Sequence, residues 1–213
     1  MPPTLKTISV VLLLCLSGAC AQPTLKDQPS AEFGSAELYP VKSSGFAEAY
    51  VRRDASLASY RAVDIEPLAV AEVEIPSTMI AGTQRRDWLM TPEREAGLQA
   101  TWAEAMDRAF KAYQRADSGR GVLRITARLT RIAPGRPTAT TIGAELQPVA
   151  SSQDVVEIWA EFRLYDVADG SLLGVIRDSR TITSMALSRT APVTMTSLFN
   201  SWAALLHTRV SGK

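Results

Sequence analysis

The residue with the clearest chemistry in this chain of 213 residues is a cysteine near its start, Cys20. It closes the run Leu16-Ser17-Gly18-Ala19-Cys20, and residues 8–16 form an apolar, uncharged stretch. That stretch fits the hydrophobic region of a secretion signal and is much shorter than the roughly 20 residues needed to cross a bilayer. Small residues ahead of a cysteine are typical of the position where bacteria attach a diacylglyceryl group to the sulfur. We therefore predict a lipoprotein signal peptide over 1–19 and a lipid-carrying Cys20 as the new N-terminus.

Two residues near the cleavage position are informative about the type of signal and about the membrane that holds the protein. Ser17 stands where such signals usually have Leu, so an ordinary secretion signal that leaves a free thiol on Cys20 is the competing interpretation. Ala21 replaces the Asp that is associated with retention in the inner membrane. We expect the anchored protein at the periplasmic face of the outer membrane, with the outer leaflet of the inner membrane as the alternative.

The rest of the sequence offers little that supports catalysis. Its one histidine, His207, has no second histidine to help build a zinc site, and Cys15 is lost with the signal. The sequence has no Gly-x-Ser-x-Gly nucleophile turn, so a hydrolase built around His207 is kept only as an alternative. We expect no catalytic residue, no metal site and no cofactor, and hence a protein that is not an enzyme.

Alternation along two expected strands places arginines and aromatic residues on one outward side. Arg124 and Arg128 share strand parity, and so do Trp159 and Tyr165 further along the chain. Exposed aromatic side chains among charges often form contact surfaces, so these four are our candidate partner-binding residues. The competing interpretation is an ordinary solvated sheet face, in which the arginines pair with Glu161 and its neighbours on the next strand.

The charge balance limits the class of partner. Loss of Lys6 with the signal leaves 22 basic and 22 acidic residues, and no basic excess is available for nucleic acid. Hydrophobic residues make up 46% of the chain, which is the composition of an ordinary globular domain. We therefore expect no nucleic-acid partner and one domain.

Hydrophobic periodicity predicts the elements that position these residues. Strands are expected over 60–70, 121–132, 156–165 and 172–182, and amphipathic helices from Thr91-Pro92-Glu93 and from about residue 192. A loop rich in Pro, Gly and Thr follows the second strand over 133–154. The resulting order, β-α-β-β-β-α, predicts an α+β fold: a small, mostly antiparallel sheet with two amphipathic helices packed on it.

We expect this fold to follow two other regions. Residues 1–19 are the signal peptide, 20–44 are the lipidated cysteine and a flexible tether, and 45–213 are a single α+β domain. The tether is predicted from scattered Pro, Ser and Gln and from the lack of a sustained apolar period.

Several of these segments together resemble a known family. The run Ser44-Gly45-Phe46, the strand over 60–67, the long helix, the strand over 123–132 and the hairpin turn at 166–170 resemble the bacterial lipoproteins grouped as domain-of-unknown-function 3313. The likeness covers most of the mature domain. The order of elements is also similar, more distantly, to the N-terminal domain of the TolB translocation protein and to lipoprotein activators of peptidoglycan synthases. The family resemblance implies an envelope lipoprotein without assigned activity, and it transfers no catalytic residue.

Besides the hydrolase alternative, the sequence leaves two non-enzymatic functions open. The first is a non-enzymatic, lipid-anchored cell-envelope lipoprotein, attached to the membrane through Cys20, that binds an envelope protein or glycan through the polar face of its sheet. The alternative is an accessory or carrier lipoprotein that holds a small apolar ligand or lipid between sheet and helices. The carrier alternative predicts a cavity lined by residues such as Trp102, Phe110 and Phe162.

Overall fold

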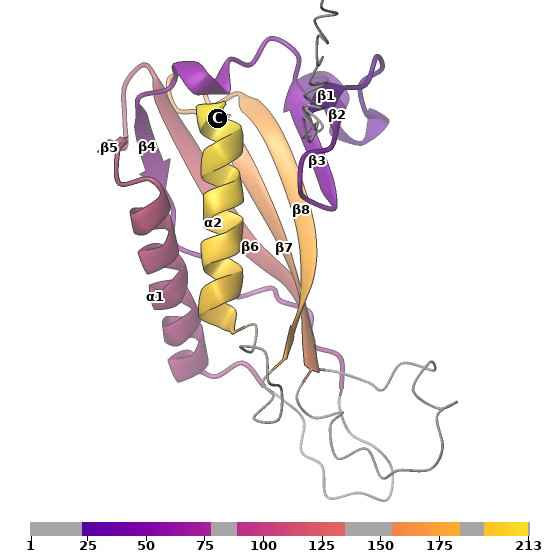
Figure 1. The fold of residues 1–213 in the computed structure, drawn as a ribbon, viewed down its shortest axis with the longest axis vertical. Helices are drawn as coiled ribbons and strands as arrows, with labels where there is room; N and C mark the ends of the chain where they lie inside the picture. The colour runs from indigo at the N-terminus through magenta and orange to yellow at the C-terminus, as the bar shows by residue number, and fades with distance from the viewer. Residues whose placement is uncertain (1–22, 78–88, 135–154, 184–193, 213) are drawn as a thin grey trace, which may run out of the picture.

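A single mixed sheet forms the framework of the protein. The computed structural model describes residues 23–77, 89–134, 155–183 and 194–212 (Figure 1). Within them, eight strands form one sheet in the order β1-β2-β3-β8-β7-β6-β4-β5, with β4 parallel to β5 and β6 and the other neighbours antiparallel. The elements in chain order are β1 (Thr24–Leu25), the 3-10 helix η1 (Ala31–Ala36), β2 (Leu38–Lys42), β3 (Glu48–Arg52), the 3-10 helix η2 (Leu57–Ser59), β4 (Ala62–Ile65), α1 (Pro92–Ala109), β5 (Gln114–Arg115), β6 (Val122–Pro134), β7 (Val155–Asp166), β8 (Leu172–Thr183) and α2 (Met195–Ser211).

The predicted fold class, a small, mostly antiparallel sheet with two helices in the order β-α-β-β-β-α, is wrong. The sheet is larger and mixed, and β1, β2 and β3 precede the first strand that the sequence predicted. Residues 24–42 were assigned to a flexible tether, but they hold β1 and β2 at one edge of the sheet. These strands are only two and five residues long, and β2 contains Pro40. The sequence therefore has no apolar alternation from which they could be predicted. Pairing between β3 and the long β8 attaches them to the rest of the sheet.

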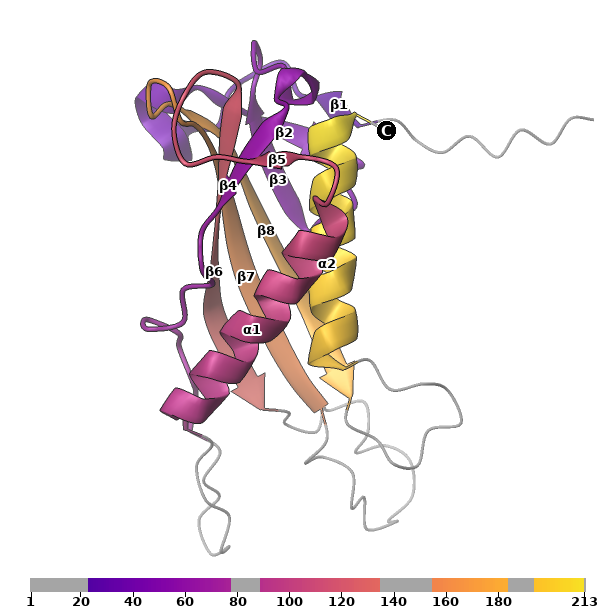
Figure 2. The same ribbon diagram turned by 90° about the vertical axis from the view of Figure 1, so that its left-hand side faces the viewer.

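Local chemistry determines where the two α-helices begin and end. The hydroxyl of Thr91 accepts a hydrogen bond from the backbone N–H of Arg94 (3.4 Å) at the start of α1, and a proline follows the cap. Thr194 and Ser197 cap the start of α2 reciprocally, and Gly212 ends it in the left-handed conformation at φ 71°. Both helices lie on one face of the sheet and contact each other (Figure 2).

Aromatic rings fill the layer between the helices and the sheet. Trp102 stacks on Phe162 with ring centroids 5.6 Å apart, and Phe199 meets Trp102 edge-on at 5.5 Å. Phe110, at the end of α1, is fully buried and meets the ring of His207 edge-on at 5.4 Å. Trp102, Phe110 and Phe162 therefore pack as core anchors against neighbouring rings, which argues against the carrier alternative at this position.

One carboxylate, Asp178, is buried on the helix side of β8. Its oxygens accept hydrogen bonds from the indole N–H of Trp202 (2.7 Å), the backbone N–H of Ala47 (3.0 Å) and Nε of Arg180 (2.8 Å). A buried charge is tolerated when it is fully hydrogen-bonded and paired, as it is here. Asp178 thus ties α2 and the loop before β3 to the sheet.

Candidate functional site

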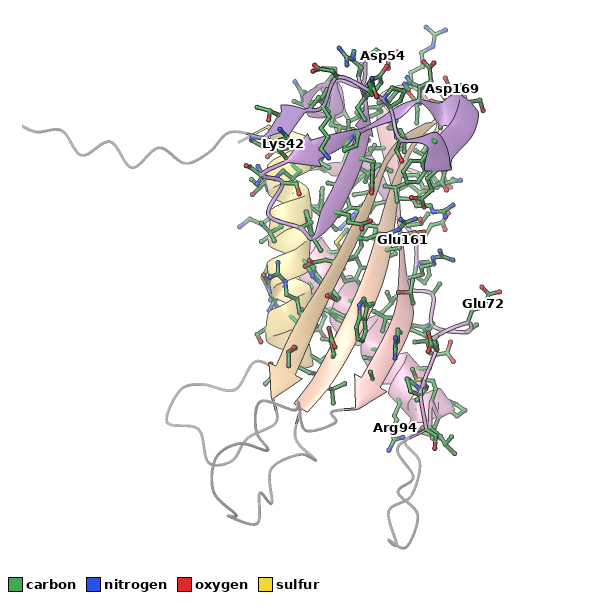
Figure 3. All side chains as sticks on the ribbon, turned by 90° about the vertical axis from the view of Figure 1, so that its right-hand side faces the viewer. Lys42, Asp54, Glu72, Arg94, Glu161 and Asp169 are labelled. Atoms are coloured by element: carbon green, nitrogen blue, oxygen red, sulfur yellow. The ribbon has the colours of Figure 1, made fainter. Side chains whose placement is uncertain are left out.

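The face of the sheet turned away from α1 and α2 carries the polar side chains of β6, β7 and β8 (Figure 3). The register places Arg124 opposite Tyr165, Arg128 opposite Glu161, and Glu161 in turn opposite Arg177. Residues opposite each other in neighbouring strands point to the same side of the sheet. We call this side the open face, and the four predicted partner-binding residues all belong to it.

At the middle of the open face, one carboxylate is enclosed by three guanidinium groups. Oε1 of Glu161 lies 3.0 Å from Nη2 of Arg128 and 2.8 Å from Nε of Arg163, and Oε2 accepts from Nε of Arg177 at 2.9 Å. The side chain of Glu161 is only 3% exposed, whereas those of the three arginines are 33–48% exposed. We call these four residues the Glu161 cluster.

Electrostatics keeps this glutamate ionised. Burial alone raises the pKa of Glu161, but the hydrogen bonds from Arg177 and Arg163 and the charge of Arg128 outweigh it, so the pKa lies below its usual 4.5. Charge-assisted hydrogen bonds of this kind are among the stronger polar contacts in proteins. The cluster is therefore a fixed pattern of charge near neutral pH, not a proton donor.

Arg177 extends the cluster to the N-terminal part of the chain. Its Nη1 lies 3.1 Å from Oε2 of Glu32 in η1 and 3.5 Å from Oε2 of Glu48 in β3. Beside it, the ring of Phe33 packs against Tyr50 with centroids 4.9 Å apart. Helix η1 therefore lies over the β3–β8 part of the open face and covers part of it.

Two hollows on the open face divide the predicted residues into pairs. A hollow of about 370 Å³ is lined by Arg124 and Tyr165 together with Thr126. A second, of about 480 Å³, is lined by Arg128 and Trp159 together with members of the Glu161 cluster. The structure thus brings Arg124 to Tyr165 and Arg128 to Trp159.

Two arginines of this face are occupied by other contacts. Nε of Arg124 lies 2.7 Å from Oδ2 of Asp64 and 3.3 Å from Oε1 of Glu66. Arg131 places its guanidinium 5.0 Å from the ring centre of Trp159, which is a cation–π distance. Arg124 therefore serves the β4–β6 pairing, and Arg128 keeps the more exposed side chain, at 48% against 38%.

Sequence reasoning missed the part played by Arg163, Arg177 and Glu32. Arg163 shares parity with Glu161 and Tyr165 on β7, so the alternation was a usable signal for it. The contact of Arg177 with Glu161 can be predicted only when the register between β7 and β8 is known. That register is set by the hairpin and by an irregularity between Leu164 and Tyr165. Nothing in the sequence around Glu32 indicates that it reaches β8.

Other predicted sites have different outcomes. Cys20 and nearly all of the loop over 133–154 lie outside the described residues. His207 packs edge-on against Phe110 and Tyr113. In the described ranges, no group of three or more potential metal ligands is found. No helix in the same ranges is both long and apolar enough to traverse a bilayer.

Comparison with known proteins identifies a family and a set of distant folds. The family model described as "Protein of unknown function (DUF3313)" matches residues 31–206. No curated protein matches the chain. A PelC dodecamer from Paraburkholderia phytofirmans is similar at 14% identity and a TM-score of 0.39, over 74% of this chain and 96% of that one. A protein from Xanthomonas campestris assigned to DUF330 is similar at 11% identity and a TM-score of 0.35, over 76% and 87%.

Proposed function

The chain belongs to the DUF3313 family of proteins of unknown function, and we propose that it is a lipid-anchored, non-enzymatic binding protein of the cell envelope. Its anchor is Cys20, whose sulfur takes a diacylglyceryl group from a phospholipid. In that step the thiol proton leaves, a thioether bond forms, and the phosphate-bearing head group departs. The anchored domain lies at the periplasmic face of the outer membrane.

The open face is the binding surface in this proposal, and the Glu161 cluster carries it. The compensating carboxylate is covered, because the side chain of Glu161 is 3% exposed, while the side chains of Arg128 and Arg163 stay 48% and 40% exposed. A partner that approaches Arg128 and Arg163 therefore meets their positive charge before it meets the negative charge of Glu161 beneath them. Such an arrangement favours carboxylate or phosphate groups, which guanidinium binds through paired hydrogen bonds.

An aromatic ring beside the cluster supports the same interpretation. Trp159 is half-buried and lines the same hollow as Arg128 and Thr130. Aromatic and arginine side chains together are typical of the energetically dominant part of protein interfaces. The partner we propose is an acidic envelope component, a protein or a glycan, that seats on Arg128 and Trp159.

Capture from solubilised membranes tests this proposal. Full-length protein and the variants Arg128→Gln and Trp159→Ser are compared with Arg120→Gln, which changes an exposed arginine in the turn before β6. We expect one specific acidic component to be retained by the wild type and by Arg120→Gln, to be lost from both open-face variants, and to be released by salt. Equal capture by all four proteins would contradict the proposal, and matched melting temperatures show that the folds are intact.

A further inference from the structure

A further concave region is lined by residues of β1, β2 and β3 and of the C-terminal end of α2. These elements lie at the same end of the molecule (Figure 1). The region is a groove of about 670 Å³, within the range of roughly 300–1,000 Å³ that is usual for small-molecule sites. Apolar side chains from separate elements form most of its walls: Leu25, Val41, Phe46, Val51, Leu57 and Ile176.

One apolar side chain in the wall of the groove, that of Leu25, is unusually exposed to solvent. Leu25 in β1 is 40% exposed, and it is one of only two large apolar side chains exposed to that extent among the described residues. Arg52, Arg53 and Arg209 also line the groove and place polar groups beside its apolar walls. The groove thus combines an apolar interior with a few polar groups, the usual pattern of a site for an amphiphilic molecule.

The start of the described chain is fixed at this groove. Pro23 lines it, and β1 pairs with β2 so that Leu25 lies opposite Val41. The backbone N–H of Lys26 donates to the carbonyl of Pro40 (2.9 Å), and Nη2 of Arg53 donates to the carbonyl of Asp27 (3.0 Å). Any group attached a few residues before Pro23 is therefore held close to the groove.

The number of residues between Cys20 and Pro23 limits the distance between the lipid and the groove. Cys20 precedes Pro23 by three residues, and three residues span at most about 11 Å even when fully extended. A long flexible connection would let the anchor and the domain separate, but this one is too short for that. The first atoms of a lipid on Cys20 lie within the reach of one acyl chain from the groove.

We propose that one acyl chain carried by Cys20 occupies this groove. The inference rests on the lipid anchoring proposed above and adds where one of the chains lies. The bilayer interior is as apolar as the groove, so the chain itself gains little by moving. The gain comes from Leu25, which is 40% exposed, and from the half-buried Val41, Val51 and Leu57, whose apolar surface leaves water when the groove is filled. The remaining chains stay in the membrane and hold this end of the domain against it.

Intramolecular photo-crosslinking tests the proposal. Cells that express the full-length protein are fed a long-chain fatty acid with a diazirine near its end, and purified membranes are irradiated. The intact mass first establishes whether Cys20 carries the lipid. We expect adducts that join the Cys20 peptide to peptides containing Val41, Val51 or Leu57. Adducts with phospholipid alone, on a lipidated Cys20, would overturn the inference and leave the anchor standing. An unmodified Cys20 would overturn both.

A pair of tryptophan variants gives the matched control. Ala58 is exposed and lines the groove, so Ala58→Trp fills part of it without disturbing the core. Ala204 is exposed on α2 and lies outside the groove lining, so Ala204→Trp adds the same bulk elsewhere. We expect loss of the groove adducts in Ala58→Trp and wild-type yield in Ala204→Trp. Equal yields in the two variants, with equal lipidation, would contradict the proposal.

Discussion

Glu161 and Arg177 lie opposite each other on β7 and β8, and Oε2 of the glutamate accepts from Nε of the arginine at 2.9 Å. The same arginine also pairs with Glu32, which is 145 residues away in sequence. One guanidinium group therefore connects the centre of the open face to η1. The face that we propose for binding is built partly from residues that the sequence assigned to a tether.

Removal of the central carboxylate should destabilise the fold. In Glu161→Gln the three arginines, whose side chains are 33–48% exposed, lose a shared counter-charge that is itself buried. We expect the free energy of unfolding at pH 7 to fall by about 1–3 kcal/mol, the usual cost of losing hydrogen bonds to a charged group. Urea unfolding measures it, with Glu104→Gln on the exposed side of α1 as the control. An unchanged midpoint in Glu161→Gln would contradict the account of the cluster.

The same carboxylate makes stability depend on pH in one direction. Because the folded-state pKa of Glu161 lies below 4.5, the folded state binds this proton less readily than the unfolded chain. Its contribution is therefore fully present above about pH 4.5 and is lost as the pH falls through the folded-state pKa. Thermal unfolding from pH 7 to pH 3 should show a steeper loss for the wild type than for Glu161→Gln. Parallel curves would exclude this titration.

The contact of η1 with the open face should be local. Glu32 is 46% exposed in its pair with Arg177, and exposed ion pairs contribute about 0–1 kcal/mol. We expect the double variant Glu32→Gln, Phe33→Ala to speed hydrogen exchange over residues 30–38 and to leave exchange in β7 unchanged. Slower or equal exchange in η1 would show that these two side chains do not hold it.

The buried carboxylate on the helix side should matter more for folding than any single pair on the open face. In Asp178→Ala, the indole N–H of Trp202 and the backbone N–H of Ala47 lose their acceptor. We expect a loss of about 2–4 kcal/mol in the free energy of unfolding, since buried unsatisfied groups cost about 1–3 kcal/mol each. Asp117→Ala, in an exposed turn, serves as the control in the same denaturant titration. Near-equal stability of the two variants would contradict this.

Charge reversal at Arg124 should lower the stability of the fold, which is not what its position in the sequence pattern indicates. If Arg124 were only a docking residue, charge reversal would remove partner binding and leave the fold stable. In the structure its guanidinium joins β6 to β4 through Asp64 and Glu66, so Arg124→Glu places three carboxylates together. We expect a lower melting temperature for Arg124→Glu than for Arg120→Glu. Equal melting temperatures of Arg124→Glu and Arg120→Glu would show that Arg124 does not stabilise the fold.

The elements that the sequence predicts well are the long ones whose apolar residues recur regularly. β6 and β7 are 13 and 12 residues long and alternate over most of their length, with an irregularity in β6 between Leu129 and Arg131, and the N-terminal cap of α1 follows from Thr91 and Pro92. In such segments the local secondary-structure preference of the residues agrees with the pattern of buried positions, so the sequence is sufficient to predict the element.

What the sequence misses depends on contacts between distant segments. β1 and β2 have too few residues for a pattern, and β1 exists only through its pairing with β2. Parallel pairing of β4 with β6 joins residues about 60 positions apart, as in the contact of Asp64 with Arg124. The outward parity of Arg128 and Trp159 was predictable, but their neighbours Arg177 and Glu32 follow only from tertiary structure.

The measurement that tests the central claim most directly is site-specific photo-crosslinking in living cells. A photoreactive amino acid replaces Thr126, on the open face between Arg124 and Arg128, or Glu104, on the exposed side of α1. The account predicts one discrete adduct with an acidic envelope component from position 126, none from position 104, and loss of the adduct when Arg128→Gln is added. The same adducts from both positions, or an adduct from position 126 that survives Arg128→Gln, would contradict binding through the open face.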